Sequence, residues 1–113
     1  MNKDIKEKWL QALRGGKYSQ GKGFLRNKDD KYCCLGVLCD LYSKEKGVKW
    51  NLEDDFPRFF FLSSTIFLPQ AVIDWSELET RNPYIKSEGM ILGTLNDKGY
   101  DFEKIADLIE KNL

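Results

Sequence analysis

Residues 33–46, with the sequence CCLGVLCDLYSKEK, are apolar on every side over the first half of the stretch. Periodicity alone does not separate a buried strand from a buried helix, but the stretch is longer than a typical strand. Gly47 supplies a stop signal at its end. A helix that is hydrophobic all round lies at the centre of a domain. Gly36 costs such a helix about 1 kcal/mol relative to alanine, which predicts that another backbone segment passes close to it.

The remaining pattern predicts further helices and short strands around this central helix. Apolar residues predict helices over 3–14, 88–96 and 102–112. Pro69 fits the first position of a further helix over 70–76. Short β-prone stretches predict strands at 24–26, 31–33, 48–50 and 56–62, with a turn at 27–30 that makes the first two a hairpin. The sequence therefore predicts one compact α+β domain over residues 1–113, mainly helical, with a small antiparallel β-hairpin or sheet.

The composition excludes several classes of function. Hydrophobic residues make up 42% of the chain and charged residues 32%, which is typical of a soluble globular protein. No apolar run reaches the ~18 residues of a membrane helix, and the charged N-terminus does not resemble a signal peptide. The absence of histidine excludes Ser-His-Asp and Cys-His catalytic arrangements and histidine-bearing zinc sites. We therefore expect no cofactor, no metal and no catalytic residue, and we favour a binding protein over an enzyme.

The three cysteines, Cys33, Cys34 and Cys39, form no C-x-x-C pair. Reduced, buried thiols of an intracellular protein are the expected state. The alternative is a nucleophilic role for Cys33 or Cys34 if either lies at a helix N-terminus, where the helix dipole lowers the pKa of a thiol.

The net charge is zero, but the charge is unevenly distributed along the chain. Residues 1–50 hold 12 basic and 6 acidic residues, and residues 51–113 hold 6 basic and 12 acidic residues. Such asymmetry marks an interaction surface or two halves that neutralise each other in the fold. Because a domain that binds duplex DNA is normally basic overall, we expect no sequence-specific DNA binding.

The segment from Arg14 to Lys28 contains five cations, four glycines and no acidic residue. It nearly matches a P-loop, but Gly23 stands where the motif needs a hydroxyl, and the segment follows a helix instead of a strand. Glycines allow backbone N–H groups to approach an anion, arginine suits phosphate, and tyrosine stacks on bases. The segment therefore predicts a site for a small anionic ligand or nucleic-acid backbone, with a solvated loop as the alternative. The candidate ligand-binding residues are Arg14, Lys17, Tyr18, Gln20, Lys22, Arg26 and Tyr32.

Four of the seven phenylalanines lie between Phe56 and Phe61, after an acidic run at 53–55 that is expected to be solvated. Either a strand buried on both faces or an exposed face that meets a partner explains this density. Phe59, Phe60 and Phe61 are the candidate residues of a partner interface. Since a domain of this size has limited interior, we expect a homodimer or higher homo-oligomer.

Three blocks of the sequence resemble small proteins encoded by tailed bacteriophages and prophages. These blocks are residues 8–14 (KWLQALR) with 18–21 (YSQG), residues 32–41 (YCCLGVLCDL), and residues 95–99 (LNDKG) with 102–110 (FEKIADLIE). The resemblance implies a viral accessory protein in the cytoplasm of the bacterial host. It implies a role against antiphage defence, most simply the sequestration of a nucleotide-type immune signal. The alternatives are a protein-binding inhibitor of a host defence complex, anti-CRISPR-like or mimicking nucleic acid, and a small enzyme that degrades a signal nucleotide.

Overall fold

The computed structural model describes residues 1–52 and 55–113, so the Glu53 and Asp54 positions of the acidic run lie outside the described residues. The described chain has α+β architecture and is mainly helical, as the sequence predicts. Its helices are α1 (Lys3–Arg14), α2 (Cys34–Lys46), α3 (Gln70–Ser76), α4 (Leu92–Asp97) and α5 (Phe102–Asn112). Among the described residues, none of the helices has the length and apolar character needed to cross a membrane.

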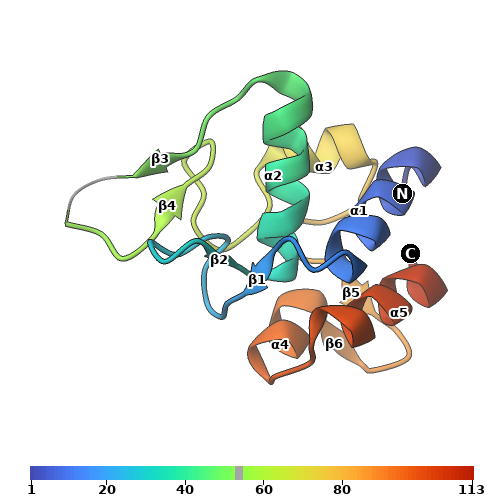
Figure 1. Ribbon diagram of the computed structural model, residues 1–113. Helices are drawn as coiled ribbons and strands as arrows, with labels where there is room; N and C mark the ends of the chain where they lie inside the picture. Colours follow the sequence, from blue (N-terminus) through green and yellow to red (C-terminus); the bar gives the residue numbers. More distant parts are fainter. Residues whose placement is uncertain (53–54) are drawn as a thin grey trace.

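Six two-residue strands form three small pairs in the described part of the chain. β1 (Ser19–Gln20) pairs in parallel with β2 (Lys31–Tyr32), β3 (Asn51–Leu52) pairs antiparallel with β4 (Phe59–Phe60), and β5 (Tyr84–Ile85) pairs antiparallel with β6 (Met90–Ile91). Single antiparallel bridges from Arg26 to Tyr32 and from Asn27 to Arg58 connect the first two pairs. Figure 1 shows β3 and β4 projecting on one side of α2, with α1 and α5 on the other.

The predicted central helix is α2. Every residue from Cys34 to Asp40 is buried, and α1, α3 and α4 all contact this helix. The fully buried Trp9 of α1 donates a hydrogen bond from its indole Nε1 to the carbonyl oxygen of Cys34 at 3.0 Å. This bond fixes the start of α2 against α1 and satisfies a buried polar group.

The helix boundaries follow local capping signals. The Asn2 side chain accepts a hydrogen bond from the backbone N–H of Ile5 at the start of α1. Asp101 accepts one from Lys104 at the start of α5. These caps satisfy N–H groups that the first helical turn leaves without a partner. Gly47 ends α2 with a φ of 70°, the left-handed conformation that glycine adopts without a steric cost.

The helix predicted over 88–96 is wrong in its first half. Residues 84–91 form the β5–β6 hairpin, whose turn includes Gly89 at a φ of 67°, and α4 begins only at Leu92. The continuous apolar run from Met90 to Leu92 fits a strand as well as a helix, so periodicity could not place the boundary.

The predicted strands also differ from the structure, and the one expected over 56–62 is reduced to Phe59–Phe60. The strand expected at 48–50 forms at Asn51–Leu52 instead, because side chains of α2 hold the preceding residues. Ser43 Oγ donates to the Val48 carbonyl oxygen at 2.5 Å, and Trp50 Nε1 donates to Asp40 at 3.0 Å.

The hairpin expected from 24–26 and 31–33 is reduced to the single bridge between Arg26 and Tyr32. Lys31–Tyr32 pairs instead with Ser19–Gln20 in parallel. The sequence around these residues contains no signal that predicts this pairing. The predicted turn at 27–30 is present, and its Asn27 side chain accepts hydrogen bonds from the backbone of Asp29 and Lys31.

The close approach predicted at Gly36 is confirmed. A Cβ atom at this position would overlap the Leu25 carbonyl oxygen and lie 2.6 Å from the carbonyl carbon. The same carbonyl accepts a hydrogen bond from the backbone N–H of Cys33 at 3.3 Å. The Leu25 segment therefore crosses directly over the first turn of α2, at a distance that only glycine permits.

We predict that Gly36→Ala lowers the free energy of unfolding by about 3 kcal/mol or more. Helix propensity alone would favour alanine by about 1 kcal/mol, so a loss reports the steric overlap with backbone that cannot rotate away. Gly47→Ala is the control, since nothing lies within 4 Å of its Cβ position and only the left-handed φ is strained. That control should cost about 1–2 kcal/mol in urea denaturation followed by circular dichroism. Equal or higher stability of Gly36→Ala would contradict the close crossing.

Candidate functional site

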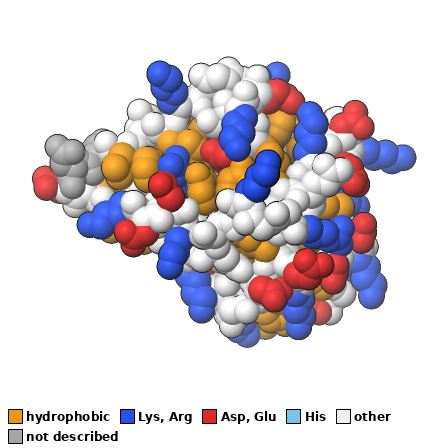
Figure 2. Space-filling model, viewed as in Figure 1, with side chains coloured by type: hydrophobic (Ala, Val, Ile, Leu, Met, Phe, Trp, Pro, Cys, Tyr) orange, Lys and Arg blue, Asp and Glu red, His pale blue; other side chains and the backbone are white. Residues whose placement is uncertain are grey.

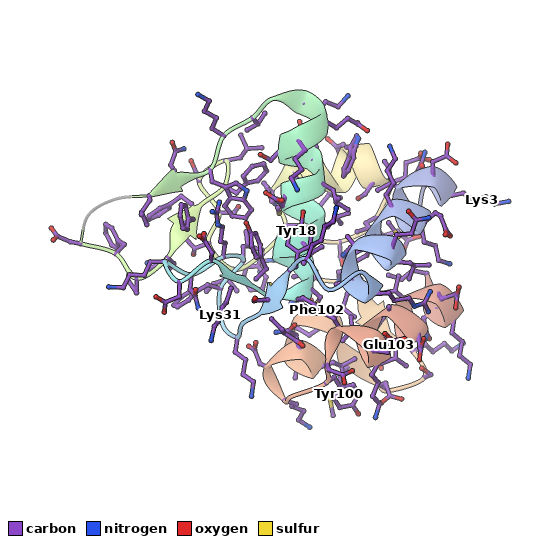
Figure 3. The ribbon with its side chains drawn as sticks, viewed as in Figure 1. Lys3, Tyr18, Lys31, Tyr100, Phe102 and Glu103 are labelled. Carbon is purple, nitrogen blue, oxygen red and sulfur yellow. The ribbon has the colours of Figure 1, made fainter. Side chains whose placement is uncertain are left out.

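A groove of about 310 Å³ opens between the end of α1, the second half of α2 and the segment that follows α1. We call it the lysine groove, because three lysines line it. Its walls come from neighbouring positions on each helix, one or two turns apart, and from the chain around Tyr18, which lies in front of α2 in Figure 3. The lining residues are Lys8, Gln11, Ala12, Gly15, Lys17, Tyr18, Leu41 and Lys44.

The lysine groove carries positive charge and no acidic lining residue. Two of its lysines are near carboxylates: Lys8 Nζ lies 3.5 Å from a Glu45 oxygen, and Lys44 Nζ lies 3.3 Å from an Asp40 oxygen. Lys17 is exposed and makes no ion pair with any described residue. Figure 2 shows the same face, with exposed hydrophobic side chains between lysine and arginine side chains.

Asp40 lies behind the wall of the groove and is only 7% exposed. One carboxylate oxygen accepts a hydrogen bond from the Tyr18 hydroxyl at 2.5 Å, and the other accepts from Trp50 Nε1 at 3.0 Å. Lys44 Nζ donates to the Tyr18 hydroxyl oxygen at 3.2 Å. Burial, together with the hydrogen bond to Asp40, raises the pKa of Tyr18 well above its ordinary value. Tyr18 is therefore a neutral, fixed wall of the groove.

An aromatic cluster, formed by Tyr18, Tyr32, Trp50, Phe59 and Phe61, extends from this wall to β4. Its rings pack mostly edge to face, with centroids 5.0 Å apart for Tyr18 and Tyr32, 6.0 Å for Tyr32 and Trp50, and 6.3 Å for Trp50 and Phe59. Such packing is worth about 0.5–1.5 kcal/mol per pair beyond area burial. Burial raises the pKa of Tyr32 to about 12. The cluster therefore joins the groove to the β3–β4 pair through neutral rings.

Arg26 packs against this cluster. Its guanidinium carbon lies 3.9 Å from the Phe59 ring centroid, 5.3 Å from that of Tyr32 and 5.5 Å from that of Trp50. Asp30 accepts hydrogen bonds from Arg26 at 2.9 and 2.5 Å. The side chain is only 18% exposed, so the alternative of a solvated loop is wrong for this residue.

Two of the predicted ligand-binding residues serve contacts elsewhere in the fold. Arg14 Nη2 lies 2.8 Å from Asp107 and 3.2 Å from Glu110, both on α5, and so ties α1 to α5. Gln20 Nε2 donates to Asn96 Oδ1 at 2.9 Å and to a backbone carbonyl at 2.7 Å.

The structure brings Lys17 and Tyr18 together in the groove and places Arg26 and Tyr32 in the adjoining cluster. Lys22 is exposed and is not among the groove lining. Of the predicted ligand-binding residues, Lys17 and Tyr18 therefore line the groove, and the others lie outside its lining.

The predicted interface phenylalanines differ in exposure. Phe61 is fully buried and packs against Trp50, with ring centroids 4.7 Å apart. Phe59 and Phe60 are half-buried, and Phe60 packs edge to face against the exposed Phe56. Phe61 thus belongs to the core, whereas Phe60 and Phe56 form part of an exposed apolar surface.

Sequence reasoning missed Lys8, Lys44, Asp40 and Trp50 as site residues. Asp40 and Lys44 are four residues apart on the predicted central helix, a spacing that predicts contact. The sequence predicts that both face solvent, and this is wrong for Asp40, which is buried. Lys8 carried no comparable signal, because it joins the groove only through the packing of α1 on α2.

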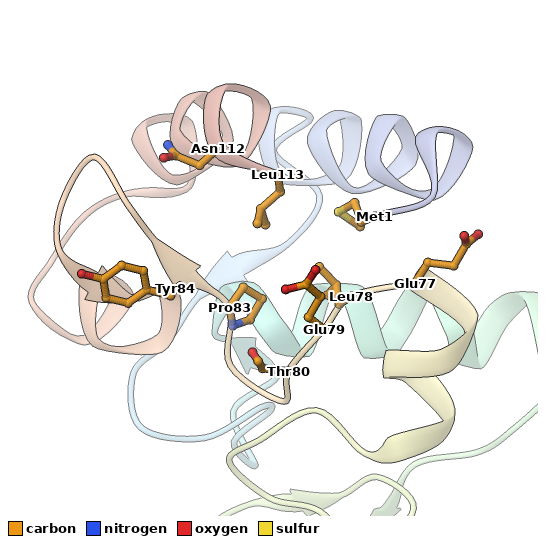
Figure 4. Close-up of a pocket in the computed structure, with 9 residues that line it drawn as sticks. All are labelled: Met1, Glu77, Leu78, Glu79, Thr80, Pro83, Tyr84, Asn112 and Leu113. Atoms are coloured by element: carbon orange, nitrogen blue, oxygen red, sulfur yellow. The ribbon is translucent and has the colours of Figure 1, made fainter.

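A second cavity of about 390 Å³ lies between the α3–β5 connection and the end of α5 (Figure 4). Its polar side chains come from Glu77, Glu79, Thr80, Tyr84 and Asn112, and none of the described residues that line it is lysine or arginine. Glu77 accepts a hydrogen bond from Asn2 at 3.0 Å. This lining does not suit an anion.

Cys33 is the N-cap residue of α2, the position that would favour a thiolate through the helix dipole. Burial opposes this effect: it raises the pKa of Cys33 to about 11 and the pKa values of Cys34 and Cys39 well above the ordinary value. All three thiols are free and buried. In residues 1–52 and 55–113, no group of three or more metal-ligating acidic, cysteine or histidine side chains converges. All three thiols therefore lie in the core, where burial favours their protonated form.

We predict that the folded protein resists alkylation at pH 7.5, whereas all three thiols react in denaturant. The thiolate is the reacting species, and burial keeps each thiol protonated.

Since the pKa of Cys33 is about 11 in the folded protein against 9.0 as the ordinary value, the free energy of unfolding should also fall as pH rises from about 9 to 11. Mass spectrometry after iodoacetamide treatment measures the alkylation of the thiols. Rapid modification of one thiol in the folded state would contradict it.

We predict that Arg26→Ala lowers the free energy of unfolding by about 2 kcal/mol, because the guanidinium is desolvated against three rings. Arg26→Lys keeps the charge but loses the planar stacking and should give an intermediate loss. Lys22→Ala, a change at an exposed position of the same segment, should stay within about 0.5 kcal/mol of wild type. Thermal unfolding of the three variants makes the comparison. Equal stability of Arg26→Ala and Lys22→Ala would exclude a packed role for Arg26.

Comparison with known proteins adds a family but no activity. No curated protein and no solved structure matches the chain. A family model described as a domain of unknown function, DUF8296, matches residues 1–113, which is the whole sequence. The chain therefore belongs to the DUF8296 family.

Proposed function

We propose that the protein is a non-enzymatic binding protein that holds a small nucleotide-type anion in the lysine groove. The observation that carries this proposal is the lining itself, because Lys8, Lys17 and Lys44 line the groove together with Tyr18 and none of the described lining residues is acidic. Lysine ammonium groups bind phosphate as point charges, and a tyrosine ring offers a surface on which a base stacks.

The size of the groove favours a small ligand over nucleic acid. Small-molecule sites usually occupy about 300–1,000 Å³, and the groove measures about 310 Å³. It is therefore large enough for one nucleotide unit. Leu41 and Ala12 provide apolar contact beside the lysines. The Gln11 amide donates one N–H to Glu7 at 3.3 Å and has a second N–H and an oxygen for a base edge.

The chemistry of the site supports binding without turnover. The sequence has no histidine to act as a general base. Burial raises the pKa of the Cys33 thiol to about 11. The pKa of Tyr18 is also raised, so its hydroxyl stays protonated and donates a hydrogen bond to Asp40. Charge and shape in the groove are suited to capture, which needs association alone.

The resemblance of three sequence blocks to bacteriophage proteins supports a biological role for such capture. A viral accessory protein that sequesters a nucleotide immune signal in the host cytoplasm would need affinity and abundance, but no catalytic residue. A fixed groove wall serves this task, because a preorganised site loses less entropy on binding.

We predict that Lys17→Ala weakens nucleotide binding by roughly 10- to 100-fold, because a hydrogen bond to a charged group contributes about 1.5–3 kcal/mol. Lys22→Ala is the matched control, because this lysine is exposed in the same segment but does not line the groove. Isothermal titration calorimetry would use AMP, cyclic AMP, ADP-ribose and a cyclic dinucleotide as ligands. Affinity should fall as salt rises, because the lysines are exposed.

Two results would contradict this assignment. If Lys22→Ala loses binding while Lys17→Ala retains it, the anion site lies in the glycine-rich loop. If the wild-type protein binds no member of the panel, the proposal of a small ligand fails and a protein-binding role takes its place.

A specific observation favours a protein-binding inhibitor as the second candidate function. Leu52, Phe56 and Leu62, around the β3–β4 pair, are 50%, 38% and 41% exposed. Exposed apolar surface of this kind marks protein interfaces, and a host defence protein or a second copy of the chain would cover it. Native mass spectrometry of the protein purified from bacteria distinguishes a bound partner from a homo-oligomer.

A further inference from the structure

Asp40 and Lys44 form an unequal pair beside the lysine groove. The Lys44 side chain is 70% exposed, whereas the Asp40 side chain is 10% exposed, and their charged atoms lie 3.3 Å apart. Hydrogen bonds from Tyr18 and Trp50 hold the Asp40 carboxylate in place. The carboxylate is therefore fixed, and the lysine is the member of the pair that can move toward a ligand.

The carboxylates next to the groove reduce its positive charge. Three lysines line it, and two of them contact a carboxylate, Lys8 with Glu45 and Lys44 with Asp40. These three lysines and the two carboxylates that they contact together carry a charge of +1, and Glu45 also contacts Lys46. A ligand phosphate that approaches Lys44 must also approach the Asp40 carboxylate, which repels it.

This balance decides between two kinds of phosphate. A phosphodiester carries one negative charge, whereas a terminal phosphate carries about −1.5 to −2 at pH 7. Attraction to the groove rises in proportion to ligand charge, but the cost of removing an ion from water rises with the square of its charge. A weakly positive groove therefore favours the singly charged ligand, and a strongly positive groove favours the doubly charged one.

We propose that Asp40 is a specificity-determining residue that tunes the lysine groove for a singly charged phosphodiester nucleotide over a nucleotide with a terminal phosphate. This inference rests on the proposed function, because it concerns the same groove. Asp40 does not touch the ligand in this proposal. Its negative charge partly neutralises the positive charge of Lys44, and it also repels the ligand phosphate through the groove wall.

Calorimetry with 3′,5′-cyclic AMP and AMP tests the inference, because the two ligands share base and sugar and differ in phosphate charge. Wild type should bind cyclic AMP more tightly than AMP. Asp40→Asn retains an oxygen that accepts a hydrogen bond and removes the charge. It should raise affinity for cyclic AMP about threefold and for AMP about tenfold, since the electrostatic gain doubles with the ligand charge.

Glu45→Gln provides a second variant at an exposed position, in case Asp40→Asn does not fold. Glu45 contacts Lys8 at 3.5 Å and also Lys46 at 3.7 Å, which does not line the groove. Removing the negative charge of Glu45 should therefore change the ratio of the two affinities in the same direction as Asp40→Asn, by about twofold.

The outcomes separate the inference from the proposed function. If wild type binds neither nucleotide, the proposed function fails and the inference fails with it. If wild type binds both but prefers AMP, or if folded Asp40→Asn leaves the affinity ratio unchanged, the groove binds nucleotides and Asp40 does not set the preference. If Asp40→Asn does not fold, an unchanged ratio in Glu45→Gln overturns the inference. A larger gain for AMP than for cyclic AMP in Asp40→Asn supports the inference, whereas the same change in Glu45→Gln alone assigns the preference to Glu45 and overturns it.

Discussion

The buried amide of Asn96 joins three segments on which the rest of the structure depends. Asn96 is fully buried. Its Oδ1 accepts hydrogen bonds from the backbone N–H of Cys34 at 3.2 Å and from Gln20 Nε2 at 2.9 Å. Its Nδ2 donates a hydrogen bond to the Gly21 carbonyl oxygen at 2.8 Å. Since a buried amide left without partners costs about 1–3 kcal/mol, α4, the start of α2 and the β1 segment are fixed relative to one another. The position of Tyr18, just before β1, follows from this arrangement, and so does one wall of the lysine groove.

Elements with signals inside their own sequence could be predicted, and elements that depend on distant partners could not. Both terminal helices have an apolar stripe and an N-cap residue, so their bounds follow from local sequence. Gly36 likewise predicted a close backbone contact, although the sequence did not show that Leu25 is the residue in contact. The parallel pairing of β1 with β2 and the hairpin at 84–91 had no such signal, because a two-residue strand is too short to show a period.

The candidate site divides in the same way. Lys17 and Tyr18 were predicted because cations and glycines cluster locally, and Arg26 because it belongs to that cluster. Its stacking on Phe59, a residue far along the chain, was beyond local reasoning, and this contact makes Arg26 a packed residue. Lys8 could not be predicted, because only the packing of α1 against α2 brings it to the groove. The sequence thus indicates which chemistry is present, and tertiary packing decides which charges share one surface.

The aromatic cluster relates the two candidate surfaces of the molecule. Tyr18 lines the groove, and its ring contacts Tyr32, which contacts Trp50, which in turn packs against Phe59 of β4. The same Trp50 donates to Asp40. A wall held from both sides loses little freedom when a ligand binds, so the entropy cost of binding falls mainly on the exposed lysines. Under the proposed function, affinity for an anion depends on how many lysine charges remain available to it, and the carboxylates next to the groove lower that number.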